Sequence, residues 1–323
     1  MTKPVLLMTR RFPDAVEARA QRDYVTIPNP ADTAMEGAAI IAAARQSGAA
    51  GIFCAAGDAM GAATIAELPE GVRIIATFSV GTDHIDLGAA KARGIVVTNT
   101  PDVLSVATAE IAFLLILTAA RRGGEAERMV RTRQWAGWAP TQLMGVTLEG
   151  KRLGILGMGR IGQALAQMAR GFGMEIHYRN RNRLSPGEEQ GAIYHDSDEG
   201  FLGAIDVLSM HIPGGAATRQ WLNADRIAQL KRGAIVVNTG RGTTVDDAAL
   251  CAALQSGHLR AAGLDVFEGE PNIFEGYHSA PNTVLLPHLG SATVETRDAM
   301  GFRCLDNLDA VLLRGEAPLH PVG

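Results

Sequence analysis

Short apolar runs alternate with alanine-rich stretches of helical periodicity through the first hundred residues. The apolar runs predict strands, and the stretches between them predict helices. The predicted strands are Val5–Met8, Gly51–Cys54, Arg73–Thr77 and Ile95–Thr98, and the predicted helices are Met35–Arg45, Ala59–Leu68 and Leu87–Arg93. Strands separated by helices are typical of a parallel sheet that is covered by helices on both faces.

The same alternation resumes after residue 150. The apolar runs there predict strands at Arg152–Leu156, Met174–Tyr178, Asp206–His211, Ala234–Asn238, Ala262–Val266 and Thr283–Leu286. Six strands are what a complete doubly wound dinucleotide-binding fold requires. Ligands bind at the carboxyl ends of the strands in such sheets, so the residues that follow these runs are the candidates for function.

Two long helical segments connect the two parts. Asp102–Arg122 is apolar on most sides, so we expect it to be buried against two surfaces, either between domains or against a partner subunit. Ala292–Leu313 follows the last strand, and we expect it to return to the first domain. The prediction is an α/β protein with two doubly wound parallel-sheet domains. Residues 1–101, completed by 290–323, form a discontinuous flavodoxin-like substrate domain, and residues 102–289 form a Rossmann cofactor domain.

The stretch RLGILGMGRIGQALAQMARGFG at residues 152–173 reads as a strand, a tight turn and a helix. Gly157, Gly159 and Gly162 form the pattern GxGxxG within it. The first glycine permits the sharp turn, the second lets the backbone approach a pyrophosphate, and the third lets helix and strand pack closely. The helix start would direct its N–H groups at a phosphate. This context predicts a dinucleotide site, and the first hundred residues have no such fingerprint.

The residues after the second strand of the cofactor domain favour NADP. An NAD-specific site usually has Asp or Glu there, whereas arginine accommodates the 2′-phosphate of NADP. This chain has Arg179, Asn180 and Arg181, with Asn180 in the usual place of the acid and Arg181 as the best phosphate ligand. A guanidinium can bond two phosphate oxygens at once. We expect a preference for NADPH; the alternatives are a solvated basic loop and the use of NAD.

Three polar residues follow predicted strand ends, and together they suit the reduction of a 2-keto acid. Arg241 follows the strand in NTGRG, Glu270 stands in LDVFEGEP, and His288 stands in LLPHLGS. Each alone is also compatible with an ordinary surface or turn position. Arginine can bind the substrate carboxylate, and histidine can supply the proton for the developing alkoxide. A nearby carboxylate orients the imidazole and favours its protonated form.

Composition narrows the classes of function. The chain has 323 residues, a formal charge of -4 and a pI near 6.1, so no field would attract nucleic acid or an anionic membrane. Three scattered cysteines without a CxxC pair suggest reduced thiols in the cytoplasm. We expect no secretion, because no leader pattern opens the chain, and no metal site, because HExxH and cysteine clusters are missing.

The chain resembles the D-isomer-specific 2-hydroxyacid dehydrogenase family. The motifs GILGMGRIG, MHIP, VVNTGRG, LDVFEGEP and PHLGSAT carry the resemblance, in this order and at similar spacing. The resemblance implies that Val80 and Gly81, in SVGTD, bind the substrate carboxylate through the backbone. It also implies cofactor contacts at Thr108, Gly159, Arg160, Ile161, His211, Ile212, Pro213, Thr239, Asp265, Gly290 and Ser291. Homodimers are usual in this family.

Within the family, the insert NIFEGYHSAPN before the last strand and the arginines after Tyr178 are similar to those of glyoxylate and hydroxypyruvate reductases. Formate dehydrogenases have glutamine in the role of Glu270, and the chain ends too soon after His288 for the regulatory domain of long 3-phosphoglycerate dehydrogenases. One alternative is a reductase for larger 2-keto acids, with Phe53–Gly57, Trp135 and Trp138 shaping the pocket. The other is a redox-sensing binding protein like the C-terminal binding protein corepressors, since fold does not determine function. The presence of all three catalytic residues argues against it.

Overall fold

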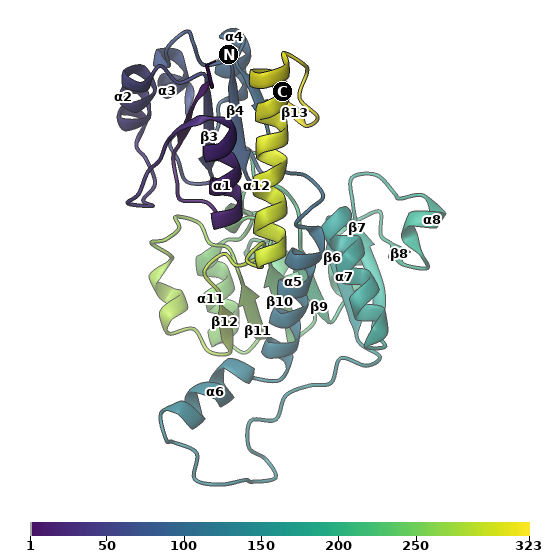
Figure 1. Cartoon of the computed structure of the whole chain (residues 1–323). Coiled ribbons are helices and arrows are strands. Elements are labelled where there is room, and N and C mark those ends of the chain that lie inside the picture. Colours follow the sequence, from purple (N-terminus) through teal and green to yellow (C-terminus); the bar gives the residue numbers. More distant parts are fainter. Residues whose placement is uncertain (1) are drawn as a thin grey trace. The chain divides into compact units, whose positions relative to one another are not determined.

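The computed structural model describes residues 2–323, which form two compact units. The first unit contains the chain up to Leu104 together with Ala292–Gly323, and the second contains Ser105–Ser291. The chain therefore leaves the first unit once and returns to it (Figure 1). Both units are α/β, as the alternation of apolar runs and helical stretches predicts.

The sheet of the first unit has the strand order β13-β5-β4-β3-β1-β2. Its strands are β1 (Val5–Met8), β2 (Val25–Ile27), β3 (Gly51–Ala55), β4 (Ile74–Phe78), β5 (Val96–Thr98) and β13 (Pro321–Val322). All pairs are parallel except β13 with β5. The order of the five parallel strands is that of flavodoxin-like sheets. The apolar runs did not identify β2 and β13, which are only three and two residues long.

Helices cover both faces of this sheet. Figure 1 shows α1 (Asp14–Asp23) and α12 (Val294–Asp309) in front of it, and α2 (Gly37–Ser47), α3 (Ala62–Glu67) and α4 (Leu87–Ala92) complete the layers. Along β3, Ile52 and Cys54 belong to one apolar cluster and Phe53 to the other, as alternation in a strand requires. A sheet buried on both faces favours apolar side chains along its strands, which explains the apolar runs in the sequence.

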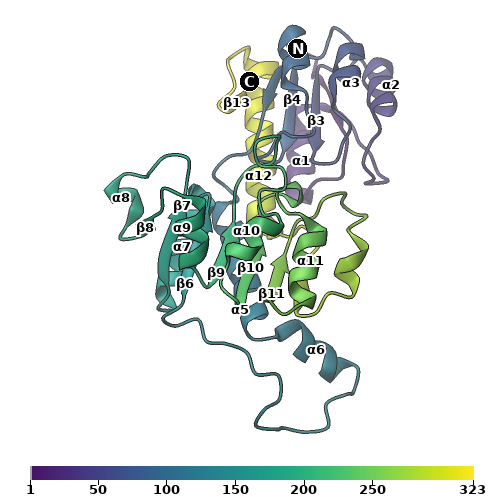
Figure 2. The same cartoon turned by 180° about the vertical axis from the view of Figure 1, so that it is seen from behind.

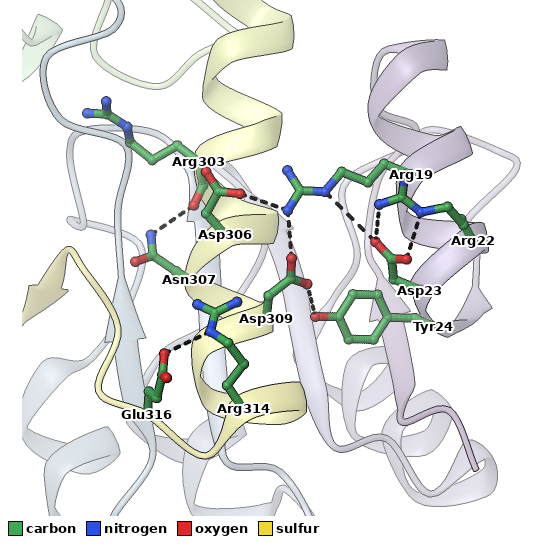
Figure 3. Close-up of polar contacts among 10 residues, drawn as sticks. All are labelled: Arg19, Arg22, Asp23, Tyr24, Arg303, Asp306, Asn307, Asp309, Arg314 and Glu316. Atoms are coloured by element: carbon green, nitrogen blue, oxygen red, sulfur yellow. Dashed lines mark hydrogen bonds and ion pairs between the residues drawn. The ribbon is translucent and has the colours of Figure 1, made fainter. Parts of the chain in front are cut away.

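A polar cluster attaches the C-terminal helix to α1 within the first unit (Figure 3). One nitrogen of Arg19 donates to Asp306 at 2.7 Å and to Asp309 at 2.6 Å. The hydroxyl of Tyr24 donates to the other oxygen of Asp309 at 2.5 Å. Asp309 is 7% exposed, so its charge is nearly withdrawn from water and depends on these two partners.

We expect Asp309→Ala to lower the free energy of unfolding by about 3 kcal/mol, because it leaves Arg19 and Tyr24 without their shared buried acceptor. Asp306→Ala is the matched control, since that carboxylate is half exposed and bonds the same arginine. The control should change stability by less than about 1 kcal/mol. Urea unfolding followed by circular dichroism measures both, and equal effects of the two variants would contradict this ranking.

The second unit has an all-parallel sheet with the order β12-β11-β10-β9-β6-β7-β8. Its strands are β6 (Arg152–Leu156), β7 (Glu175–Arg179), β8 (Ile193–Tyr194), β9 (Val207–Met210), β10 (Ala234–Asn238), β11 (Leu259–Leu264) and β12 (Thr283–Leu285). The order reverses between β6 and β9, which is the switch point where doubly wound sheets bind ligands. The described part of the second unit thus contains one strand more than the six expected. The additional strand is β8, which pairs with β7 through only two residues and was not predicted from the sequence.

Helices α5 (Ser105–Ala120) and α7 (Arg160–Gly171) cover one face of this sheet. Figure 2 shows α9 (Asp198–Ala204), α10 (Ala224–Gln229) and α11 (Asp247–Gln255) on the other face. Helix α5 was expected to be buried against two surfaces; Ala112, Leu115 and Ile116 are buried in the core of its own unit, whereas Val106 and Leu114 are exposed. No helix in residues 2–323 is long and apolar enough to span a bilayer.

Helix α6 (Gly123–Arg131) and the loop after it extend away from the sheet of the second unit (Figures 1 and 2). No residue of α6 is buried. The loop exposes Trp135, Met144 and Trp138, the last by 81%. We refer to residues 123–145 as the arm.

Candidate active site

The glycine turn follows β6 and begins α7. Gly157 has φ = 90°, a conformation that side chains rarely adopt, and its N–H donates to the carbonyl of Arg179 at 3.0 Å. A Cβ on Gly162 would stand 2.8 Å from the carbonyl oxygen of Gly157, so only glycine lets helix and strand lie this close. A Cβ on Gly159 would meet nothing within 4 Å. The space over Gly159 is therefore open to a ligand.

A pyrophosphate fits this turn. Helix α7 begins at Arg160 and Ile161, and its N-cap residue Gly159 has no side chain to accept from the first-turn N–H groups. A helix of twelve residues with an uncapped N-terminus offers both N–H donors and a positive dipole end to an anion. The donors suit a dinucleotide, and Gly159 leaves room for it.

The segment from His211 to Pro213 passes beside the glycine turn after β9. The His211 N–H donates to the carbonyl of Leu156 at 2.8 Å, and a Cβ on Gly157 would lie 3.1 Å from the Ile212 nitrogen. The His211 ring contacts the hydroxyls of Ser209 at 2.9 Å and Thr239 at 3.2 Å. Burial lowers the pKa of His211 to about 4, so this ring is neutral and acts as a hydrogen-bonding group.

The residues at the end of β7 and after it have different hydrogen-bond partners. Asn180 accepts a hydrogen bond from the N–H of Met158 at 2.7 Å, which ties the usual position of the acid to the glycine turn. Arg179 pairs with Asp198 at 3.0 Å. Arg181 is exposed and forms no hydrogen bond or ion pair with any residue from 2 to 323. Sequence reasoning missed Asp198, because a counter-ion nineteen positions away leaves no local signal.

Arg241 lies in a tight loop after β10. Asn238 donates to the Arg241 carbonyl at 2.9 Å and accepts from the Gly240 N–H at 2.9 Å, which holds the loop closed. A Cβ on Gly242 would come within 1.8 Å of the Phe267 carbonyl carbon, so any other residue would displace the neighbouring LDVFEGEP segment. The guanidinium donates to the Gly240 carbonyl at 2.8 Å. Asn238 and Gly242 therefore position Arg241. Neither residue was assigned this role from the sequence, although both belong to the motif NTGRG.

A buried carboxylate positions the loop that carries His288. Asp265 is 1% exposed, and its two oxygens accept from the N–H groups of Leu289 at 2.7 Å and Gly290 at 2.8 Å. The Thr108 hydroxyl donates to the Gly290 carbonyl at 3.1 Å, and Ser291 ends the unit. Burial raises the pKa of Asp265 against these N–H bonds. His288 has φ = 57°, a strained conformation for a non-glycine residue that this loop holds in place.

His288 and Glu270 form a pair. Nδ1 of His288 lies 2.8 Å from one oxygen of Glu270, and the other oxygen accepts from the Phe267 N–H at 2.8 Å. The hydrogen bond to Glu270 raises the pKa of His288, against the effect of burial. Burial of Glu270 favours its neutral form, but the bonds from His288 and Phe267 outweigh it, so its pKa lies below the usual value. The positive charge of Arg241 lowers the pKa of both groups.

Val80 and Gly81 belong to the first unit and follow β4. The Val80 carbonyl accepts from the Asn99 amide at 2.8 Å, and the Gly81 carbonyl accepts from Ser79 at 2.7 Å. Because a trans peptide points its carbonyl and its N–H in opposite directions, the bond from Asn99 to the Val80 carbonyl also orients the Gly81 N–H. Within residues 2–323, no cluster of three His, Cys, Asp or Glu side chains could hold a metal ion.

The doubly wound sheet, the glycine turn and the strand-end residues define a nicotinamide-dependent dehydrogenase. A model of the D-isomer-specific 2-hydroxyacid dehydrogenase NAD-binding domain matches residues 113–290. Glycerate dehydrogenase of Hyphomicrobium methylovorum is 44% identical over 313 residues, 96% of this chain and 97% of the relative. The NADPH-dependent glyoxylate/hydroxypyruvate reductase of Sinorhizobium meliloti, solved with NADP and malonate, has a TM-score of 0.87 and 38% identity, covering 100% of this chain and 97% of that one.

The chain therefore belongs to the D-isomer-specific 2-hydroxyacid dehydrogenase family. It is a dehydrogenase of the glyoxylate reductase type that binds a nicotinamide cofactor and reduces 2-keto acids. Both the fold class and the resemblance drawn from the motifs are confirmed.

Proposed function

We propose that this enzyme reduces glyoxylate or hydroxypyruvate to the corresponding 2-hydroxy acid, with NADPH as the preferred reductant and His288 as the general acid. The observation that supports it most is the hydrogen bond of 2.8 Å between His288 and Glu270. The positive charge of Arg241 acts on the pKa of His288, which indicates that Arg241 lies near this pair. A relative named as an NADPH-dependent glyoxylate/hydroxypyruvate reductase supports the choice of substrate and cofactor.

The proposed chemistry assigns one task to each residue. Arg241 binds the substrate carboxylate, and the backbone N–H groups of Val80 and Gly81 bind it as well. A nicotinamide, when bound, supplies the hydride. His288 donates a proton to the oxygen that becomes the hydroxyl, and Glu270 orients the ring and stabilises its protonated form.

We assign the cofactor contacts to the glycine turn, to residues that follow the strands of the second unit, and to Thr108 in α5. The pyrophosphate would lie at Gly159, Arg160 and Ile161, and the 2′-phosphate at Arg181. Other contacts are proposed at Gly157, Gly162, Thr108, Arg179, Asn180, His211, Ile212, Pro213, Thr239, Asp265, Gly290 and Ser291. The bond from Met158 to Asn180 and the exposed position of Arg181 support this assignment.

A substrate panel with both nicotinamides tests the proposed function. Steady-state rates with glyoxylate, hydroxypyruvate and phenylpyruvate should give the highest kcat/KM for one of the two small acids and a lower KM for NADPH than for NADH. Higher kcat/KM with phenylpyruvate would favour the reductase for larger substrates. No oxidation of either cofactor would favour the corepressor-like binding protein.

We also propose that the enzyme is a cytoplasmic homodimer. Trp135, Trp138 and Met144 on the arm are exposed apolar side chains that a second copy of the chain would cover. The free, buried Cys54, Cys251 and Cys304 support a reducing compartment. Multi-angle light scattering should give about twice the chain mass of 34.1 kDa, and a monomer at micromolar concentration would contradict the dimer.

The raised pKa of His288 predicts how the rate depends on pH. Reduction needs the protonated ring, so its rate should be constant below the pKa of His288 and fall as pH rises through it. Oxidation of the hydroxy acid needs the neutral ring and should show the opposite trend. Glu270→Gln removes the carboxylate that raises this pKa, so the fall in reduction should occur at lower pH. Profiles of kcat/KM measure the midpoint, and an unchanged midpoint would contradict the role of Glu270.

A further inference from the structure

A buried carboxylate lies beneath the segment that carries Arg181. Glu189 ends the short helix α8 (Pro186–Glu189) between β7 and β8, and it is only 6% exposed. The Tyr178 hydroxyl donates to it at 2.5 Å, and Arg183 donates through two nitrogens at 2.7 and 3.1 Å. The bonds from Arg183 and Tyr178 hold the pKa of Glu189 below its usual value, so the group is anionic at neutral pH.

The Tyr178 hydroxyl links Glu189 to the backbone of Leu184 through hydrogen bonds. Tyr178 is fully buried in β7, and its oxygen also accepts a hydrogen bond from the Leu184 N–H at 3.0 Å. A hydroxyl has one proton, so donation to Glu189 leaves its lone pairs for Leu184. Glu189 therefore fixes the backbone at Leu184 through Tyr178.

Hydrogen bonds hold the chain on both sides of residues 181–183. On one side, Asn180 accepts from the Met158 N–H at 2.7 Å; on the other, Leu184 donates to Tyr178. The arginines of the segment differ in their partners. Arg179 pairs with Asp198 and Arg183 with Glu189, whereas the Arg181 side chain forms no hydrogen bond or ion pair within residues 2–323.

We propose that Glu189 is a positioning residue for cofactor selectivity. It holds Arg183 in an ion pair and, through Tyr178, fixes the backbone so that Arg181 is the cation presented to a 2′-phosphate. This inference rests on the proposed preference for NADPH and adds the residue that enforces it. The contact between Asn180 and Met158 does not involve Glu189, so the rest of the adenosine site should not depend on this carboxylate.

The experiment compares ligands that differ only in the 2′-phosphate. Calorimetric titration of the full chain with 2′,5′-ADP and with 5′-AMP gives the selectivity without any turnover, and KM values for NADPH and NADH extend it to the complete cofactor. We expect Glu189→Ala to weaken 2′,5′-ADP binding about tenfold, the scale of one charge-assisted hydrogen bond, and to change 5′-AMP binding less than twofold. The kcat with saturating NADPH should stay within twofold of the wild type.

Two further variants separate this role from general folding. Tyr178→Phe removes only the hydroxyl that links Glu189 to Leu184 and should also weaken 2′,5′-ADP selectively. Glu188→Ala is the matched control, because this adjacent, exposed glutamate bonds only Ser185 at the start of α8. The control should leave both affinities unchanged.

The outcomes distinguish this inference from the proposed function. Equal weakening of both ligands by Glu189→Ala, or no weakening of either, would overturn the positioning role. Loss of selectivity in Arg181→Ala but not in Glu189→Ala would overturn it as well, while leaving the proposed NADPH preference standing. A wild-type enzyme that binds 2′,5′-ADP no better than 5′-AMP would contradict the proposed preference itself, and the inference with it.

Discussion

His288→Ala is expected to lower kcat for keto-acid reduction by about a hundred- to ten-thousand-fold, the usual contribution of a positioned general acid. The variant removes the imidazole that Glu270 orients at 2.8 Å, whereas the glycine turn and the Asp265 bonds to Leu289 and Gly290 remain. NADPH affinity should therefore change little. Stopped-flow single turnovers measure the chemical step, and fluorescence titration measures cofactor binding.

His288→Gln serves as the control for shape, because it keeps a polar side chain of similar reach but cannot supply a proton at neutral pH. It should lose kcat to a similar extent as His288→Ala. Turnover equal to the wild type in either variant would refute the role of His288 as the proton donor.

Arg241→Gln is expected to reduce kcat/KM for the keto acid by about a hundred- to ten-thousand-fold. The guanidinium can make two charge-assisted bonds to a carboxylate, each typically worth about 1.5 to 3 kcal/mol. The loop itself should persist, because Asn238 bonds the Arg241 carbonyl and Gly242 makes room for the neighbouring segment. Initial rates over a range of keto-acid concentrations, at saturating NADPH, give the ratio.

Arg241→Lys should recover only part of this loss, because an ammonium keeps the charge but not the planar fork. Arg219→Gln is a control for the loss of a positive charge, since Arg219 is an exposed residue of the same unit that pairs with Glu268 at 2.7 Å. The control should leave kcat/KM within twofold of the wild type. Equal losses in Arg241→Gln and the control would contradict specific carboxylate binding.

Two of the residues that the sequence places after strands, Glu270 and His288, contact each other in the structure. Glu270 and His288 are eighteen positions apart, yet the ends of parallel strands lie along one edge of a sheet, so proximity could be expected from the pattern alone. The glycine turn could be predicted for a different reason, because its strand, turn and helix are contiguous in the sequence. The short strands β2, β8 and β13 were not predicted, whereas β5 and β12, which are no longer than β2, were predicted because Ile95 and Leu286 lengthen their apolar runs.

The basic stretch after β7 shows the limit of this reasoning. Arg179, Arg181 and Arg183 alternate with asparagines, and the sequence favours Arg181 as the phosphate ligand without showing which residues pair with the other two. Asp198 and Glu189 engage the first and third through side-chain contacts that depend on where β8, α8 and α9 fold back. Residue types at fixed spacing cannot reveal such pairings.

The order of apolar runs, glycines and strand-end side chains already specified two parallel-sheet domains, a dinucleotide turn and the residue types for keto-acid reduction, because periodicity and turn chemistry act over neighbouring positions. Which side chains meet was decided only by the folded chain. The pairing of His288 with Glu270, the retention of Arg183 by Glu189 and the buried bonds of Asp309 all join residues that packing brings together. Hydrogen bonds within two of these groups then favour the charged forms against the effect of burial: the bond to Glu270 raises the pKa of His288, and the bonds from Arg183 and Tyr178 lower the pKa of Glu189.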